Sequence, residues 1–191
     1  MTVTKTYTGA GHAETSRYDA VAVALHWLIG VALLAQITFG FLLDEIAPRG
    51  TLSRSAVINL HKSFGLVLGA AILARVVWRL GHRAPPWPAT MPKWQQRAAT
   101  WWHCALYACM LLMPASGYVA SNFSKHGVKF FGLALRPWGP DLPRVYDVFN
   151  GMHITTAWVF SVLILGHVVM ALKHALVDHA LFSRMRPRLR I

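Results

Sequence analysis

The sequence predicts an all-α protein, an integral membrane bundle of four helices that run up-down-up-down. Hydrophobic residues make up 55% of the 191 residues and charged residues only 14%, well below the roughly 25% typical of soluble domains. Residues 20–43, 98–124 and 148–172 contain no Asp, Glu, Lys or Arg. Each of these stretches exceeds the ~20 residues that cross a bilayer as a helix. A soluble helical bundle is a poor alternative, because three uncharged runs of this length are hard to keep in solution.

The first helix is expected at residues 18–43 and the second at residues 56–80, within a membrane domain that covers residues 18–178. Asp44-Glu45 and then Pro48-Arg49-Gly50 end the first helix. The second helix is less uniform, because it contains Lys62, Arg75 and Arg79. These cations fall near its two ends, where long side chains can reach the lipid headgroups, so this segment is still predicted to span the membrane.

The third helix is expected at residues 96–120 and the fourth at residues 148–177. Before the third helix, the sequence Pro85-Pro86-Trp87-Pro88 forces an extended loop. Inside the third helix, Pro114 removes one backbone hydrogen bond, which predicts a kink. In the long loop before the fourth helix, residues 128–135 are expected to lie in the membrane interface.

The net charge of +12 is spread unevenly along the chain. With the N-terminus inside, twelve of the basic residues fall in inner segments, including the flexible segment 1–17 and the basic tail 179–191, and seven fall in outer segments. This bias follows the positive-inside rule, so both termini are predicted to be cytoplasmic. The arginines of the tail suit anionic lipid headgroups, and we expect membrane lipid and not nucleic acid as the partner.

Four histidines inside the predicted spans are the strongest functional candidates: His26, His61, His153 and His167. The last two are fourteen residues apart, so both leave one face of the fourth helix about 21 Å apart along its axis. Alternating helix directions place His26 at the inner level with His167, and His61 at the outer level with His153. Two histidines facing each other across a bundle can ligate haem iron from both sides, which favours electron transfer over oxygen binding. Because the chain has no Cys-x-x-Cys-His sequence, we expect any haem at these sites to be held non-covalently, without thioether links.

Four further residues are secondary candidates. His103 falls at the inner level, where it could replace an inner ligand, hydrogen-bond a haem propionate or relay a proton. Arg75 and Arg79 lie one turn apart and either anchor the end of the second helix or pair with propionates of the inner haem. Lys62 follows His61 directly. It either extends to the headgroups or draws anions and protons towards the outer haem, which would be a catalytic role.

Short motifs in all four helices resemble the bacterial cytochrome b561 family over about residues 16–187, and their order and spacing make the match specific. The motifs are Arg17-Tyr18-Asp19, Leu25-His26-Trp27-Leu28, Leu60-His61-Lys62-Ser63-Phe64-Gly65, Arg75 with Trp78-Arg79-Leu80, His103 with Leu106-Tyr107, Gly151-Met152-His153 and Gly166-His167. The resemblance implies a four-helix cytochrome of the bacterial inner membrane with two b haems. It matches the pairing derived from topology, with His26 and His167 on the inner haem and His61 and His153 on the outer haem.

The resemblance also implies electron exchange with the ubiquinone pool. Oxidation of superoxide at the outer face is attributed to bacterial members, so superoxide:ubiquinone oxidoreductase is a candidate activity. Lys62, Lys125 and Lys129 could attract this small anion by focusing a positive field. Two alternatives stay open. One is a cytochrome b membrane-anchor subunit of a hydrogenase or dehydrogenase. The other, of a different class, is a haem-free transporter whose histidines relay protons or bind a metal ion.

Overall fold

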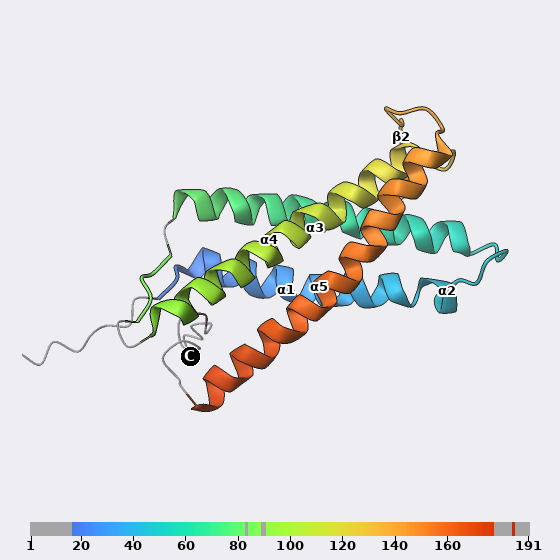
Figure 1. Cartoon of the computed structure of the whole chain (residues 1–191). Helices are drawn as coiled ribbons and strands as arrows, with labels where there is room; N and C mark the ends of the chain where they lie inside the picture. The colour runs from blue at the N-terminus through green and yellow to red at the C-terminus, as the bar shows by residue number, and fades with distance from the viewer. Residues whose placement is uncertain (1–16, 83, 89–90, 178–184, 186–191) are drawn as a thin grey trace, which may run out of the picture.

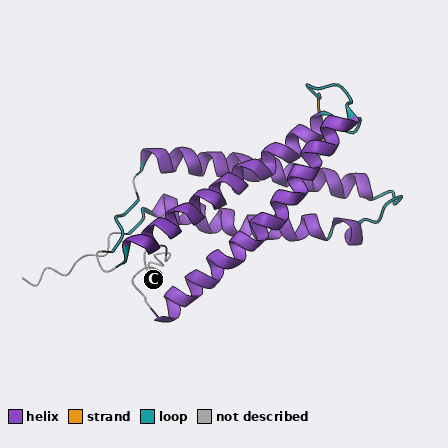
Figure 2. Ribbon diagram, viewed as in Figure 1, coloured by secondary structure: helices purple, strands orange, loops and turns teal. Residues whose placement is uncertain are grey.

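The computed structural model describes residues 17–82, 84–88, 91–177 and 185, and it confirms the all-α membrane bundle. Each of the four long helices is long and apolar enough to cross a membrane. Figure 1 shows α1 and α3 running along each other, with α4 and α5 crossing them obliquely. Most of the described chain is helical (Figure 2). The four helices are α1 (Ala20–Phe41), α3 (Arg54–Gly81), α4 (Lys93–Asn122) and α5 (Pro143–Val177).

The bundle has two ends that differ in structure. At the end we call the amino end, α1 and α4 begin while α3 and α5 end. At the opposite end, called the hairpin end, the short helix α2 (Leu43–Ile46) follows α1, and a two-stranded sheet joins α4 to α5 (Figure 1). The sheet is an antiparallel hairpin of β1 (Val128–Phe130) and β2 (Leu133–Leu135).

Three of the four long helices begin earlier than the sequence predicted. Proline explains two of these differences: α4 begins at Lys93, directly after Pro92, and α5 begins at Pro143 itself. Proline suits the start of a helix, because its φ is already near the helical value and no N–H is needed there. Hydropathy placed these starts at residues 96 and 148, close to where the uncharged stretches begin at residues 98 and 148. The helix α3 starts at Arg54, two residues before the expected position.

The remaining differences concern the loops. The first helix ends at Phe41, and α2 follows where a single helix to residue 43 was predicted. Residues 128–135 form the hairpin, and their expected place in the membrane interface stays a prediction. The predictions for the flexible segment 1–17 and the basic tail 179–191 concern residues that, apart from Arg17 and Met185, lie outside the described part of the chain.

The helix α1 begins at a side-chain cap. The carboxylate of Asp19 accepts a hydrogen bond from the N–H of Ala22 at 2.8 Å, and this bond lowers the pKa of the Asp19 carboxyl. The indole of Trp78 donates to the same oxygen at 3.1 Å. Because Trp78 lies near the end of α3, these bonds tie two helices together at the amino end.

The helix α4 continues through Pro114, which lies inside it. Gly69 of α3 faces this proline so closely that a Cβ at position 69 would come within 3.1 Å of the Pro114 Cβ. A glycine at this position therefore lets α3 and α4 approach each other in the middle of the membrane.

An apolar core fills the middle of the bundle between the two histidine levels. Phe160 of α5, only 1% exposed, lies seven residues from both His153 and His167. Many large apolar side chains instead face outward, as expected for helices surrounded by lipid. The core consists of Ile29, Leu33, Leu68, Ile72, Leu106, Cys109, Met110 and Phe160. The outward-facing set includes Leu28, Val31, Leu73, Val77, Val162 and Leu165.

Candidate functional site

The structure brings the four histidines of the predicted spans together in two pairs. At the amino end, His26 of α1 faces His167 of α5, with ring centres 6.0 Å apart and ring planes at 76°. At the hairpin end, His61 of α3 faces His153 of α5, with ring centres 6.4 Å apart and planes at 89°. The helix α5 thus supplies one ring to each pair. These are the two pairs that helix topology led us to expect.

The spacing of the rings fits two axial ligands on one metal ion. A metal–imidazole bond is about 2 Å long and the ring centre lies about 1 Å further out, so opposite imidazoles have centres about 6 Å apart. Among the described residues, no group of three or more His, Cys, Asp or Glu side chains is placed to hold a metal ion. Paired imidazoles without further protein ligands suit haem iron, whose other four ligands come from the porphyrin.

The pair at the hairpin end is shaped by close packing. The Nδ1 of His153 lies 2.9 Å from the carbonyl oxygen of Met113, so Nδ1 donates and Nε2 keeps the lone pair that a metal needs. Gly117 makes room for this ring, since a Cβ there would come within 3.0 Å of the His153 Nδ1. Gly40 does the same for His61, where a Cβ would lie 3.1 Å from Cε1.

Gln36 is a half-buried polar residue of α1 that sequence analysis missed. Its amide nitrogen donates to the carbonyl oxygen of His61 at 2.6 Å and lies 3.2 Å from the His61 Nδ1. The available signal was a lone amide side chain in an uncharged span, where polar groups are costly. Gln36 holds α1 against the ring and backbone of a candidate ligand on α3.

The β hairpin is fastened to α3 on both sides of His61. The fully buried Ser63 hydroxyl accepts a hydrogen bond from the N–H of Phe131 at 2.9 Å. The Asn59 side-chain oxygen accepts one from the N–H of Lys129 at 3.2 Å. The hairpin therefore lies against the same turns of α3 that position the His61 ring.

Lys62 makes a defined contact with the loop before the hairpin. Its ammonium group donates to the carbonyl oxygen of Gly127 at 2.8 Å, in a partly buried position. This bond holds Lys62 next to the His61–His153 level. Lys125 and Lys129, the other two cations considered at this face, are exposed.

Arg75 lies at the level of the amino-end pair. Its Nη2 is 3.4 Å from the His26 Nδ1, and its Nη1 donates to the carbonyl oxygen of Ala22 at 3.3 Å. Arginine has no acceptor atom, so the His26 Nδ1 accepts in this contact. Within the described part of the chain, the ion pairs both involve Asp44 at the hairpin end. Arg75 therefore has no described carboxylate within ion-pair distance.

His103 is a third imidazole at the amino end. Its ring centre lies 5.6 Å from that of His167, with planes at 86°. The side chain is exposed, and its Nδ1 lies 2.6 Å from the carbonyl oxygen of Ala99 on the same helix. His167 thus makes ring contacts with both His26 and His103, and ring spacing alone does not choose between them.

Arg79 takes part in contacts at the end of α3. Its Nη1 donates to the carbonyl oxygen of His82 at 3.0 Å, and its guanidinium carbon lies 5.5 Å from the centre of the Tyr18 ring. These contacts match the anchoring role, the first of the two roles considered for Arg79.

Trp102 is a further residue beside the amino-end pair that sequence analysis did not connect with it. Its indole N–H donates to the carbonyl oxygen of Leu163 at 3.2 Å. A Cβ at Gly166, the residue before His167, would come within 2.5 Å of the Trp102 ring. The glycine therefore allows the Trp102 indole of α4 to pack against the turn of α5 that carries His167.

The chain is similar to known proteins over most of its length. Residues 17–188 match a protein family described as prokaryotic cytochrome b561. Cytochrome b561 homolog 2 of Escherichia coli (strain K12) is 30% identical over 164 residues, which cover 85% of this chain and 86% of that protein. Cytochrome b561 homolog 1 of the same organism is 25% identical over 176 residues, covering 91% and 98%. The chain therefore belongs to the prokaryotic cytochrome b561 family and is a membrane electron-transfer protein of the b-haem type.

Proposed function

We propose that this protein is a dihaem cytochrome b that moves electrons across the bacterial inner membrane between an outer-face donor and the ubiquinone pool. The observation that supports two haems is the presence of two imidazole pairs, with ring centres 6.0 and 6.4 Å apart. Bound at these pairs, b haems would supply one-electron redox chemistry. His26 and His167 are the proposed ligands at the amino end, and His61 and His153 those at the hairpin end.

The surroundings of each pair give the chain a way to orient its ligands. At the hairpin end, the Met113 carbonyl fixes the tautomer of His153, and Gln36 holds His61. If both imidazoles of a pair held a haem, the iron would have no open position for another ligand, and the site would favour electron transfer over ligand binding. The helix α5 sets the distance between the levels, because fourteen residues of helix rise by about 21 Å.

Arg75 is our candidate partner for a haem propionate at the amino end. If His26 ligates iron through Nε2, its Nδ1 carries a proton and can no longer accept from Arg75. The guanidinium would then be free to form the planar, bidentate contact with a carboxylate that arginine favours. Arg79 is a weaker candidate than Arg75 for this propionate contact, because the contacts of Arg79 lie at the end of α3.

The amino end is proposed to face the cytoplasm and the hairpin end the outer side. The sequence supports this orientation through the positive-inside rule, because twelve basic residues fall in the segments predicted to lie inside and seven in those predicted to lie outside. In this orientation the His61–His153 pair would meet an outer-face donor, while quinone would enter from the membrane.

The first experiment is the absorption spectrum of the dithionite-reduced protein together with a haem-to-protein ratio. We expect low-spin b-type bands and two haems per chain, because each level offers one imidazole pair. A colourless protein would contradict the proposal and favour a histidine-dependent proton or metal transporter. Co-purification of a large hydrogenase or dehydrogenase would instead favour the membrane-anchor alternative.

Superoxide is the donor we propose for the outer face. Two superoxide anions would each give up one electron and become O₂, while one ubiquinone takes up two electrons and two protons to become ubiquinol. Lys62 would contribute positive charge beside His61, and the exposed Lys125 and Lys129 would extend that field.

We expect purified protein in vesicles to accelerate superoxide loss with ubiquinol formation at half that rate. The Lys62→Gln variant should slow both several-fold at low ionic strength, and less at high salt, because screening weakens the attraction. Lys173→Gln, at the other end of the bundle, is the matched control. Superoxide loss at the same rate with and without the protein would rule out this donor.

A further inference from the structure

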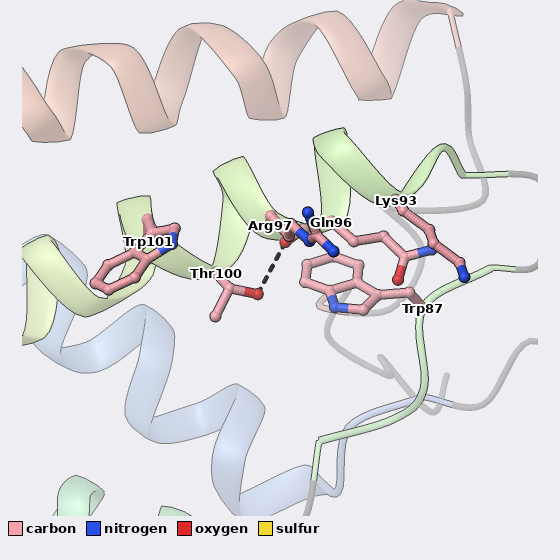
Figure 3. Close-up of a pocket in the computed structure, with 6 residues that line it drawn as sticks. All are labelled: Trp87, Lys93, Gln96, Arg97, Thr100 and Trp101. Atoms are coloured by element: carbon pink, nitrogen blue, oxygen red, sulfur yellow. Dashed lines mark hydrogen bonds between the residues drawn. The ribbon is translucent and has the colours of Figure 1, made fainter.

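A cavity at the amino end lies outside both histidine pairs. It is open to the surface, has a volume of about 430 Å³, and is formed by the first three turns of α4 and the loop before that helix. In Figure 3 the indole of Trp87 comes from this loop and lies alongside α4. The lining residues are Trp87, Lys93, Gln96, Arg97, Thr100 and Trp101.

The cavity carries positive charge without a described counter-charge. Lys93 and Arg97 are four residues apart on α4, so they lie one turn apart on one helix face. None of the six lining residues is acidic. In the part of the chain that the structure describes, both ion pairs lie at the hairpin end, where Arg49 and Arg54 meet Asp44. An anion is therefore the ligand that these two side chains can bind.

The chemical character of the lining changes along the helix. Lys93 and Arg97 lie nearest the start of α4, and Thr100 and Trp101 lie one turn deeper towards the membrane. Trp101 is 75% exposed, so its indole lies on the outer surface of the bundle. Indoles at the end of a membrane helix occupy the headgroup level, where one edge is apolar and the other is wet. From the start of α4 towards the membrane, the lining therefore offers two cations, then a hydroxyl and then an indole.

We infer that this cavity binds the headgroup of an anionic phospholipid. The phosphodiester lies between the side chains of Lys93 and Arg97, the glycerol region lies near Thr100, and the first acyl segments lie against Trp101. The polar ends of Gln96 and Thr100 already have partners in the structure, the Met91 and Gln96 carbonyl oxygens respectively, so the two cations supply the anion contacts. The order of groups along α4 matches the order of groups in a phospholipid.

A free phosphate ion shares the same anionic chemistry, but it would use only the two cations among the six lining residues. The two indoles add nothing to the binding of a small, fully hydrated anion. Indoles suit the apolar part of a lipid, and Trp101 is exposed on the outer surface and not enclosed in the protein interior. The indoles are the reason that we assign a lipid and not a soluble phosphate.

The test is native mass spectrometry of the full-length protein with equal amounts of phosphatidylglycerol and phosphatidylcholine of the same acyl chains. We expect the protein to retain on the order of tenfold more phosphatidylglycerol, since each basic residue near a lipid surface favours anionic lipid by a factor of several. The double variant Lys93→Gln/Arg97→Gln should lose this preference. Trp101→Leu should bind less of both lipids while keeping the preference.

The matched control is the double variant Arg17→Gln/Lys173→Gln, which removes two cations from the same end of the bundle but outside the cavity. It should keep the preference for phosphatidylglycerol. An equal loss in both double variants would show a diffuse positive surface and overturn the site. Displacement of phosphatidylglycerol by millimolar inorganic phosphate, or no preference in the unmodified protein, would overturn the lipid assignment. Size-exclusion chromatography of each variant shows whether it is folded and monodisperse.

Discussion

A His153→Ala protein should bind one haem per chain where the unmodified protein binds two. The ring of His153 is held 2.9 Å from the Met113 carbonyl and against Gly117, and alanine leaves this space without a nitrogen ligand. His61→Ala should have the same effect, because the two rings form one pair. The measurement is the pyridine haemochrome ratio of haem to protein, combined with the reduced spectrum of each variant.

Double variants make this prediction stricter. If His61 and His153 hold the same haem, His61→Ala/His153→Ala should still retain one haem, whereas His153→Ala/His26→Ala should retain none. The exposed His126, in the loop at the hairpin end, provides the matched control, and His126→Ala should keep two haems. Retention of two haems by His153→Ala would show that this histidine is not a ligand.

The fold could be predicted well from sequence because membrane spans have a strong signal. Residues 20–43 and 148–172 lack charges; α1 covers all but the last two residues of the first stretch, and α5 covers the whole of the second. The helix starts were less accurate, because hydropathy marks where the apolar stretch begins and not where the backbone becomes helical. Pro92 and Pro143 start their helices several residues before the apolar stretch. The hairpin was missed because three-residue strands carry little local signal.

The histidine pairs were predictable because imidazoles in apolar membrane spans are rare and alternating helix directions fix their depth. The residues that position these histidines could not be predicted in the same way. Gln36, Gly40 and Trp102 act through faces of helices that meet only in the folded bundle. A sequence gives the depth of a residue in a span, but it does not give the rotation of one helix against another. For the same reason, His103 could not be separated from His26 by depth alone.

At the amino end, we expect His26→Ala to lose one haem and His103→Ala to keep both. The rings of His26 and His103 each contact that of His167, at 6.0 and 5.6 Å, so spacing does not decide. The exposure of the two side chains and the charge beside them distinguish the two candidates. His103 is exposed, whereas His26 is half-buried and has Arg75 beside it, the cation proposed to meet a haem propionate. A ligand histidine needs packing that holds its ring in place, and His26 has more of it.

The matched control at this end is His82→Ala, which removes an exposed ring stacked on Trp78 at the end of α3 and should keep two haems. The reverse result, one haem in His103→Ala and two in His26→Ala, would make His103 and His167 the ligands.

The midpoint potential of each haem is a second measurement on the His103→Ala variant. If His103 instead interacts with a propionate, His103→Ala should shift the midpoint potential of one haem while the haem count stays at two, because a changed hydrogen bond or charge near a haem alters its potential. Potentiometric titration of the two haems in His103→Ala therefore distinguishes a nearby polar partner from an axial ligand, since loss of a ligand removes the haem or its low-spin bands.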